Sequence, residues 1–325
     1  MATQRYSLRN KRVYVAGHRG LVGQAIVRRL ALECCTVIVA SRDELDLLDP
    51  QAVNEFFARE TPNAVFLAAA KVGGIVANNT LRADFLYENL MIAANVIHAA
   101  HETKTEKLLF LGSTCIYPKY TDQPMNEDSL LTGPLEPTNE PYAIAKIAGV
   151  KLAEAYRDQY GDDFISVMPT NLYGPGDNYH SEHSHVVAAL IQRFHEAKES
   201  GAPSVMIWGT GTSRREFLYV DDMADACVFA MTKYSDRRLL NIGTGKDIAI
   251  SDFATLVATT VGYQGKITYD LARPDGTPLK RVDVTRMNNL GWHATTKLED
   301  GLKKAYDAFL DEKRSHSLRV KKSDF

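Results

Sequence analysis

Short apolar runs alternate with longer amphipathic stretches through the first half of the chain. The runs are dominated by aliphatic side chains and occupy residues 11–16, 36–40, 64–70, 107–111 and 164–168. Uninterrupted apolar runs of this length are typical of strands that are buried on both faces. The stretches between them have the helical period, so the alternation predicts an α/β fold with a Rossmann-type, doubly wound parallel sheet.

The pattern becomes irregular after residue 170, where a loop rich in histidine and glycine begins. We expect this half to supply a smaller α/β substrate domain, with the substrate in the cleft between the two domains. A later strand and helix, near residues 217–232, predict a return to the first domain. The predicted division is a Rossmann domain over 1–170 and 217–246, a substrate domain over 171–216 and 247–314, and a mobile tail over 315–325.

Two predicted helices, over residues 84–103 and 142–160, are apolar around more of their circumference than one sheet would cover. A helix that packs only on a sheet needs a single apolar stripe. The additional apolar side of each helix therefore predicts a homodimer that forms through these two helices.

Composition narrows the class of protein. The chain has 325 residues, a net charge of −2 and four cysteines without metal-ligand or disulfide spacing. The small net charge predicts no general affinity for nucleic acid, and the cysteine spacing predicts no bound metal. No apolar run approaches the roughly 20 residues that a membrane helix needs, so we expect no membrane anchor. The polar N-terminus does not resemble a secretory signal, so a reducing cytoplasm is the expected location.

The first predicted strand leads into a glycine-rich turn, Gly17-His-Arg-Gly20-Leu-Val-Gly23, and then into a helix. Strand, glycine turn and helix are the context of a dinucleotide-binding site. Gly17 suits a tight turn, Gly20 lets the backbone approach a diphosphate at the positive helix end, and Gly23 allows close packing on the strand. The spacing is G-x-x-G-x-x-G, and a purely structural turn is the competing interpretation.

The charges near this turn favour NADP(H) over NAD(H). An NAD site usually places a carboxylate at the end of the second strand, whereas here the strand runs into Ser41 and Arg42, with Arg19 in the glycine turn. Two guanidinium groups suit a 2′-phosphate, and no carboxylate is expected to repel it. The competing interpretation is that both arginines are solvated surface charges.

Tyr142 and Lys146 are four residues apart and share one face of a predicted helix. An ammonium group near a phenol lowers the pKa of the phenol, so the pair is suited to move a proton to or from a substrate oxygen. The spacing arises often by chance. The spacing indicates a catalytic pair here because the chain also has the glycine turn and Ser113, which follows another predicted strand.

Together these motifs resemble the short-chain dehydrogenase/reductase superfamily in its extended form. The resemblance implies that Tyr142 is the acid/base group, that Lys146 assists it and binds the nicotinamide ribose, and that Ser113 orients the substrate oxygen. Longer motifs, Gly112-Ser-Thr-Cys-Ile-Tyr-Pro118 and Glu136-Pro-Thr-Asn-Glu-Pro-Tyr142 among them, are similar to the GDP-L-fucose synthase family over nearly the whole chain.

The narrower resemblance implies two steps on GDP-4-keto-6-deoxy-D-mannose: epimerisation at C3 and C5, then reduction of the C4 ketone by NADPH. It identifies Cys115 and His185 as the acid/base groups of the epimerisation, without deciding which acts as acid at each carbon. The residues that it implies for the cofactor are Gly17, Arg19, Gly20, Leu21, Val22, Gly23, Arg42, Ala69, Lys146, Asn171 and His185. Those that it implies for the GDP-sugar are Arg193, Trp208, Arg215 and Lys280.

Several alternatives remain open on the sequence. Arg214 is adjacent to Arg215, so either arginine is a candidate for the diphosphate. A 4-keto-3,6-dideoxy sugar nucleotide would suit nearly the same residues, which would make the product GDP-L-colitose. A module that binds NADP(H) without catalysis is disfavoured, because all five candidate catalytic residues are present.

Overall fold

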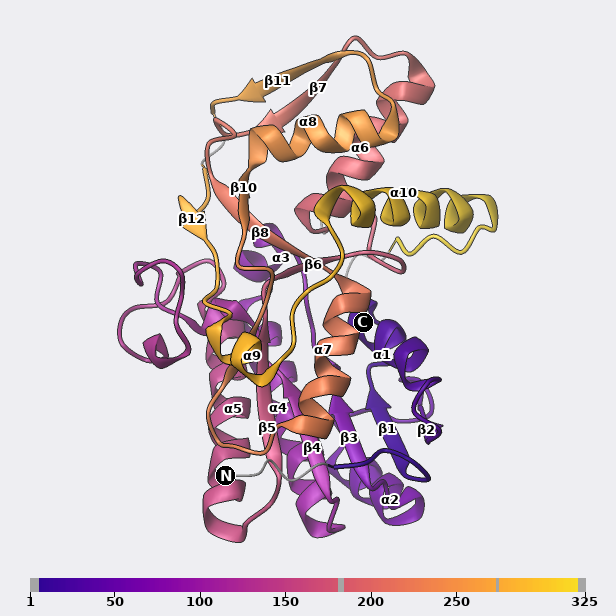
Figure 1. Ribbon diagram of the computed structural model, residues 1–325, viewed down its shortest axis with the longest axis vertical. Coiled ribbons are helices and arrows are strands. Elements are labelled where there is room, and N and C mark those ends of the chain that lie inside the picture. The colour runs from indigo at the N-terminus through magenta and orange to yellow at the C-terminus, as the bar shows by residue number, and fades with distance from the viewer. Residues whose placement is uncertain (1–5, 181–183, 273–274, 321–325) are drawn as a thin grey trace.

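A large parallel sheet forms the base of the computed structural model, and a smaller domain lies above one edge of it (Figure 1). The structure describes residues 6–180, 184–272 and 275–320. Six parallel strands run in the order β2-β1-β3-β4-β5-β9. Their bounds are β1 Arg12–Ala16, β2 Thr36–Ile38, β3 Ala64–Leu67, β4 Lys107–Leu111, β5 Phe164–Pro169 and β9 Leu240–Ile242. The predicted doubly wound parallel sheet is therefore confirmed.

Helices cover both faces of this sheet. Successive strand residues point to opposite faces, so Tyr14 belongs to one hydrophobic core while Val13 and Val15 belong to the other. The first core contains residues of α2 (Pro50–Glu60), α4 (Arg82–Glu102) and α5 (Glu140–Tyr160). The second contains residues of α1 (Leu21–Leu30), α7 (Val220–Lys233) and α9 (Thr285–Leu290).

The strand order changes direction between β1 and β3, because β2 lies on one side of this pair and β4 on the other. At such a point the loops that leave the two strands diverge, and a crevice opens at the carboxyl ends of the strands. The glycine turn follows β1, and Ala68 to Ala70 follow β3 before the short helix α3 (Ile75–Thr80).

The smaller domain packs around a third core that includes Phe194, Phe253 and Phe309. Its strands are β6 (Asn171–Tyr173), β7 (Ser204–Trp208), β8 (Arg214–Tyr219), β10 (Asp247–Ala249), β11 (Lys266–Asp270) and β12 (Leu279–Lys280). Its helices are α6 (Val186–Ser200), α8 (Ile250–Val261) and α10 (Leu298–Arg314). Two short 3₁₀ turns lie outside it, η1 (Thr114–Ile116) and η2 (Glu127–Ser129).

The chain passes between the two domains more often than the sequence indicated. All of β8 pairs with strands of the smaller domain, although the predicted boundary falls inside it at residue 217. Met287 and Trp292 return to the second core of the Rossmann domain. These crossings are tertiary contacts between distant segments, so local periodicity did not reveal them.

Part of the predicted mobile tail contacts the smaller domain. Leu318 packs against the core of the smaller domain, and the carbonyl of Arg319 accepts a hydrogen bond of 2.9 Å from the backbone N–H of Tyr179. Residues 315–320 are thus docked on the protein, and the rest of that predicted tail, 321–325, lies outside the described residues. The basic composition of the segment predicted a solvated tail, but the Leu318 side chain and the Arg319 carbonyl contact the smaller domain.

Glu216 connects the two domains from a fully buried position on β8. Its carboxylate accepts backbone hydrogen bonds from Thr244, Gly245 and Val282 at 2.5, 2.8 and 2.8 Å. Burial raises the pKa of this carboxyl, and these hydrogen bonds oppose the shift. No motif around Glu216 marks this role in the sequence.

We expect Glu216→Gln to lower the free energy of unfolding by about 2–3 kcal/mol, because an amide accepts these N–H groups more weakly and must bury its own donors. Urea denaturation of both proteins measures the change. Glu55→Gln, at an exposed position on α2, should change the free energy by less than about 0.5 kcal/mol. An equally small change for Glu216→Gln would show that the buried carboxylate does not stabilise the domain junction.

Among the residues that the structure describes, no helix is both long enough and apolar enough to cross a bilayer.

Candidate active site

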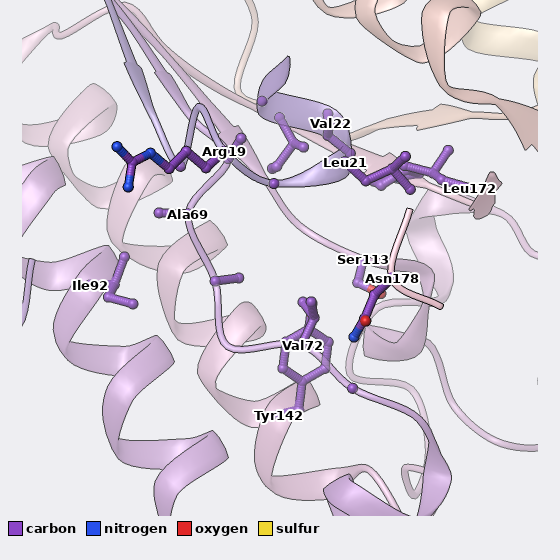
Figure 2. A pocket seen from close by; sticks show the side chains of 18 of the residues that line it. Arg19, Leu21, Val22, Ala69, Val72, Ile92, Ser113, Tyr142, Leu172 and Asn178 are labelled. Atoms are coloured by element: carbon purple, nitrogen blue, oxygen red, sulfur yellow. The ribbon is translucent and has the colours of Figure 1, made fainter. Parts of the chain in front are cut away.

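A cavity of about 640 Å³ occupies the crevice at the carboxyl ends of the strands. Figure 2 shows Arg19 and Ala69 toward one end of it and Ser113, Tyr142 and Asn178 toward the other. All five predicted catalytic residues line this one cavity: Ser113, Cys115, Tyr142, Lys146 and His185. So do all of the predicted cofactor residues, from Gly17 to Asn171.

The glycine turn has the geometry that a bound diphosphate requires. Gly17 has a φ of +83°, and a Cβ atom there would lie 2.7 Å from the backbone of Ala69. A Cβ atom on Gly23 would collide with the carbonyl oxygen of Gly17. Gly20 precedes α1, whose first turn has no side-chain cap and no acidic residue. The first amides of α1 therefore face the cavity uncompensated, as an anion-binding helix terminus does.

The region predicted to hold a 2′-phosphate contains unexpected carboxylates, because Asp43 and Asp46 line the cavity and Glu44 lies beside Ser41. The Glu44 carboxylate accepts hydrogen bonds of 2.7 Å from both the N–H and the hydroxyl of Ser41, and these bonds are the main cause of its lowered pKa. Arg19 and His18 lie close enough for their charges to lower the pKa of Glu44 further. The prediction that no carboxylate lies near the 2′-phosphate site is wrong, although Arg19 and Arg42 both line the cavity.

Tyr142 lies in the first turns of α5, with its ring edge-to-face against Phe85 at a centroid distance of 6.2 Å. Ser113, which follows β4, lies close enough to the Tyr142 hydroxyl to lower the pKa of the phenol. Burial raises the pKa of Tyr142 well above its usual value, and Cys115 adds to the shift. This differs from the predicted lowering by Lys146, and it means that Tyr142 carries its proton at neutral pH.

The Lys146 side chain is buried one turn further along α5. Its ammonium nitrogen donates a 2.7 Å hydrogen bond to the carbonyl of Leu111 and lies 5.8 Å from the centroid of the Tyr142 ring. Burial lowers the pKa of Lys146 to about 8, and Cys115 opposes this shift. The backbone of β4 therefore fixes the ammonium beside the phenol.

Cys115 is buried in η1, two residues after Ser113. The Ser113 hydroxyl accepts a 3.4 Å hydrogen bond from the backbone N–H of Cys115. Burial raises the pKa of the thiol, while the charges on Lys280 and Lys146 and a hydrogen bond with Ser113 lower it. His185 lies at the residue before α6 and lines the same cavity. A thiol and an imidazole from different domains thus face one space.

The residues predicted for the GDP-sugar are distributed over two places. Lys280 is half-buried, lines the main cavity and pairs in register with Arg215 across β12 and β8. Arg215 donates hydrogen bonds to the carbonyls of Thr277 and Arg214 at 2.5 and 2.7 Å. Arg193 and Trp208 line a separate groove, in which the guanidinium carbon lies 5.5 Å from the indole centroid.

The neighbouring arginine has a different environment, which bears on the choice that the sequence left open. Arg214 is exposed and faces Asp247 at 3.4 Å. Arg215 is mostly buried, and burial lowers its pKa. Because adjacent strand residues point to opposite faces, Arg215 is the one whose charge acts on Lys280. Asn171, on β6, lines the main cavity and donates a 2.9 Å hydrogen bond to the carbonyl of Glu216.

Several cavity residues were missed in the sequence. Glu88 of α4, Asp177, Asn178 and Arg319 all line the main cavity. No motif marks any of them. Arg319 was placed in the predicted tail, and the loop around Asp177 was the part least typical of the resembled family.

A parallel Rossmann sheet with an open glycine turn and a Ser-Tyr-Lys set at the strand ends defines a dinucleotide-dependent oxidoreductase or epimerase of the short-chain dehydrogenase type. Residues 13–243 match the model of the NAD dependent epimerase/dehydratase family. The chain belongs to this family.

Three similar proteins narrow the comparison. GDP-L-fucose synthase from Escherichia coli is 55% identical over 93% of this chain and 97% of its own length. GDP-L-colitose synthase from Yersinia pseudotuberculosis is 36% identical over 94% of this chain and 99% of its own length. The solved structure of MlghC, a GDP-mannoheptose C4 reductase from Campylobacter jejuni with NADP bound, is 37% identical, with a TM-score of 0.84 over 93% of this chain and 98% of that one.

Proposed function

We propose that the protein converts GDP-4-keto-6-deoxy-D-mannose to GDP-L-fucose with NADPH, by 3,5-epimerisation and then reduction at C4. The single observation that carries this proposal is that Cys115 and His185 share a cavity with Ser113, Tyr142 and Lys146. A plain reductase needs only the last three. The 55% identity to a GDP-L-fucose synthase over 93% of the chain supports the same substrate.

In the reductive step, bound NADPH supplies the hydride that reduces the C4 carbonyl. The proton goes from the Tyr142 hydroxyl to the oxygen on C4. The raised pKa of Tyr142 suits this direction, because the phenol is protonated before the reaction. The Lys146 ammonium lies beside the ring and stabilises the phenolate that remains, while Ser113, which lines the same cavity, orients the substrate oxygen.

In the epimerisation, the 4-keto group acidifies the hydrogens on C3 and C5, because the resulting carbanion is delocalised as an enolate. Inversion removes a proton from one face of each carbon and returns a proton to the other. Cys115 comes from the Rossmann domain and His185 from the junction with α6, so the two groups approach the cavity from different elements. Thiol and imidazole side chains can both act as general acids and bases in such an exchange.

The nucleotide part of the substrate requires cations and an aromatic surface. Lys280 and Arg215 supply adjacent positive charges that suit a diphosphate. The groove with Arg193 and Trp208 extends the proposed site into the smaller domain, where an indole and a guanidinium suit a purine base. The cofactor diphosphate is assigned to the amides of α1, and Arg19 and Arg42 to the 2′-phosphate.

The 3,6-dideoxy substrate is the second candidate. The GDP-L-colitose synthase that matches this chain is 36% identical, against 55% for the GDP-L-fucose synthase. This difference favours the substrate with a 3-hydroxyl group.

The deciding experiment combines the purified protein with NADPH and GDP-4-keto-6-deoxy-D-mannose in heavy water. We expect NADPH oxidation and a GDP-L-fucose product that carries deuterium at C3 and C5. Oxidation without deuterium would leave a plain C4 reductase and remove Cys115 and His185 from the chemistry. Turnover of the dideoxy substrate in preference to this one would favour the colitose assignment.

We also propose a homodimer through α4 and α5. These helices pack against each other and expose large apolar side chains: Tyr87, Leu90, Ile144 and Tyr160. Exposed apolar groups gathered on neighbouring helices are a common feature of subunit interfaces. A cytoplasmic location is part of the same proposal, and the four free cysteines support it.

The dimer proposal predicts that Leu90→Arg shifts the protein from twice its 36.1 kDa chain mass to the monomer mass. An arginine at this site would place an unpaired charge in the centre of the proposed interface. Sedimentation velocity at micromolar concentration measures the mass. The control is Leu32→Arg, at a more exposed leucine that follows α1, and it should leave the mass unchanged. A monomeric wild-type protein would contradict the proposal.

A further inference from the structure

The C-terminal segment after α10 turns back toward the crevice at the strand ends. In Figure 1 the chain leaves the end of α10 and runs back along that helix toward the centre of the molecule. The backbone N–H of Ser317 bonds the carbonyl of Glu312, Leu318 packs on the smaller domain, and the carbonyl of Arg319 accepts the Tyr179 N–H. These contacts bring Arg319, a residue of the predicted tail, to the wall of the main cavity.

The end of α10 and the segment that follows it hold Gly176 by both of its backbone groups. The Gly176 N–H donates a 2.9 Å hydrogen bond to the Glu312 carboxylate, and its carbonyl accepts one of 3.3 Å from the Arg319 guanidinium. Gly176 has a φ of +80°, a conformation that favours glycine. The loop is thus fixed to the C-terminal segment at a residue whose neighbours, Asp177 and Asn178, also line the cavity.

This contact lies on the cofactor side of the cavity. A Cβ atom on Gly176 would lie 2.9 Å from the side-chain oxygen of Gln24, and the Gln24 amide donates a 2.9 Å hydrogen bond to the carbonyl of Arg19. Gln24 belongs to the first turns of α1. The loop that Arg319 binds therefore packs against the same helix terminus that is open to a diphosphate.

We propose that Arg319 is a cofactor-binding residue, whose guanidinium group attracts the diphosphate of NADP(H) at the N-terminus of α1. The inference rests on the proposed NADP(H) cofactor. The cations assigned to the GDP-sugar, Lys280 and Arg215, lie on β12 and β8 instead. The hydrogen bond to the Gly176 carbonyl holds the guanidinium at the wall of the cavity, where it would meet an anionic ligand.

The test measures NADPH binding in the absence of any sugar nucleotide, by fluorescence titration of the purified protein. We expect Arg319→Gln to raise the Kd about tenfold and Arg319→Lys about threefold, since a charge-assisted contact is lost in the first and weakened in the second. Glutamine can still donate to the Gly176 carbonyl, so it separates the charge from the tether. The control is Arg314→Gln, at an exposed arginine that pairs with Asp311, and it should stay within about twofold.

Three outcomes would overturn the inference. An unchanged Kd for Arg319→Gln would show that Arg319 only positions the loop around Gly176. If Arg319→Gln weakens the binding of NADPH but not of NADH, the guanidinium contacts the 2′-phosphate rather than the diphosphate. Weaker binding of GDP with unchanged binding of NADPH would assign Arg319 to the sugar nucleotide. Failure of the wild type to bind NADPH would instead contradict the proposed cofactor, so the two failures are distinguishable. The salt dependence of the NADPH Kd should also be less steep for Arg319→Gln than for the wild type.

Discussion

Tyr142→Phe is expected to lower the rate of NADPH oxidation about a thousandfold, within the range of general acid catalysis, while deuterium exchange at C3 and C5 continues. The substitution removes the hydroxyl that protonates the C4 oxygen and leaves the ring in its edge-to-face contact with Phe85. The exchange persists because the proposed acid/base groups of the epimerisation, Cys115 and His185, are unchanged.

The measurement has two parts, nicotinamide absorbance for the hydride step and mass spectrometry of the recovered keto sugar for the exchange. Tyr160→Phe, at the exposed end of α5, is the matched control and should keep both rates. NADPH should bind Tyr142→Phe with nearly the wild-type Kd. Loss of exchange together with reduction would show that Tyr142 also acts in the epimerisation, and the proposed separation of roles would fail.

Cys115→Ser is expected to reduce exchange at C3 or C5 at least about a hundredfold, a typical effect of losing a positioned acid/base group. Serine fits the buried position in η1, but its hydroxyl does not ionise near neutral pH. The thiol is tuned by opposing effects, because burial raises its pKa while Lys280 and Lys146 lower it. A serine hydroxyl gains little from either ammonium group.

Cys35→Ser is the control for this variant, because Cys35 is a half-buried thiol that contacts the carbonyl of Leu30, far from the cavity. Near-wild-type exchange in Cys115→Ser would remove the residue from the proposed mechanism. The carbon at which exchange is lost first identifies where the thiol acts, and the matching His185→Asn experiment identifies the imidazole's share.

Local sequence was sufficient for the elements that surround the cofactor. The glycine turn, the strand that precedes Ser113 and the helix that carries Tyr142 and Lys146 all lie where the pattern predicted them. Each is encoded by neighbours in the chain: a buried apolar run, glycines at fixed spacing, or residues four apart on a helix. For that reason the positions of these three elements followed from the sequence.

The pKa of Tyr142 did not follow from the sequence. The spacing to Lys146 indicated a lowered value, but the ammonium is hydrogen-bonded to Leu111 and burial raises the pKa of the phenol instead. The balance between desolvation and a neighbouring charge depends on every group packed around the site. Spacing along one helix cannot supply it.

The sequence by itself determined the alternation of buried strands and helices, the glycine turn and the spacing of Tyr142 and Lys146 on one helix, because each depends on interactions within a short stretch of chain. Only the tertiary structure decided that Cys115 and His185 face one cavity, that Glu216 joins the domains, and that Arg319 returns to the loop beside α1. These three arrangements connect residues up to 143 positions apart. Such contacts form only when the whole chain packs, so no local pattern records them.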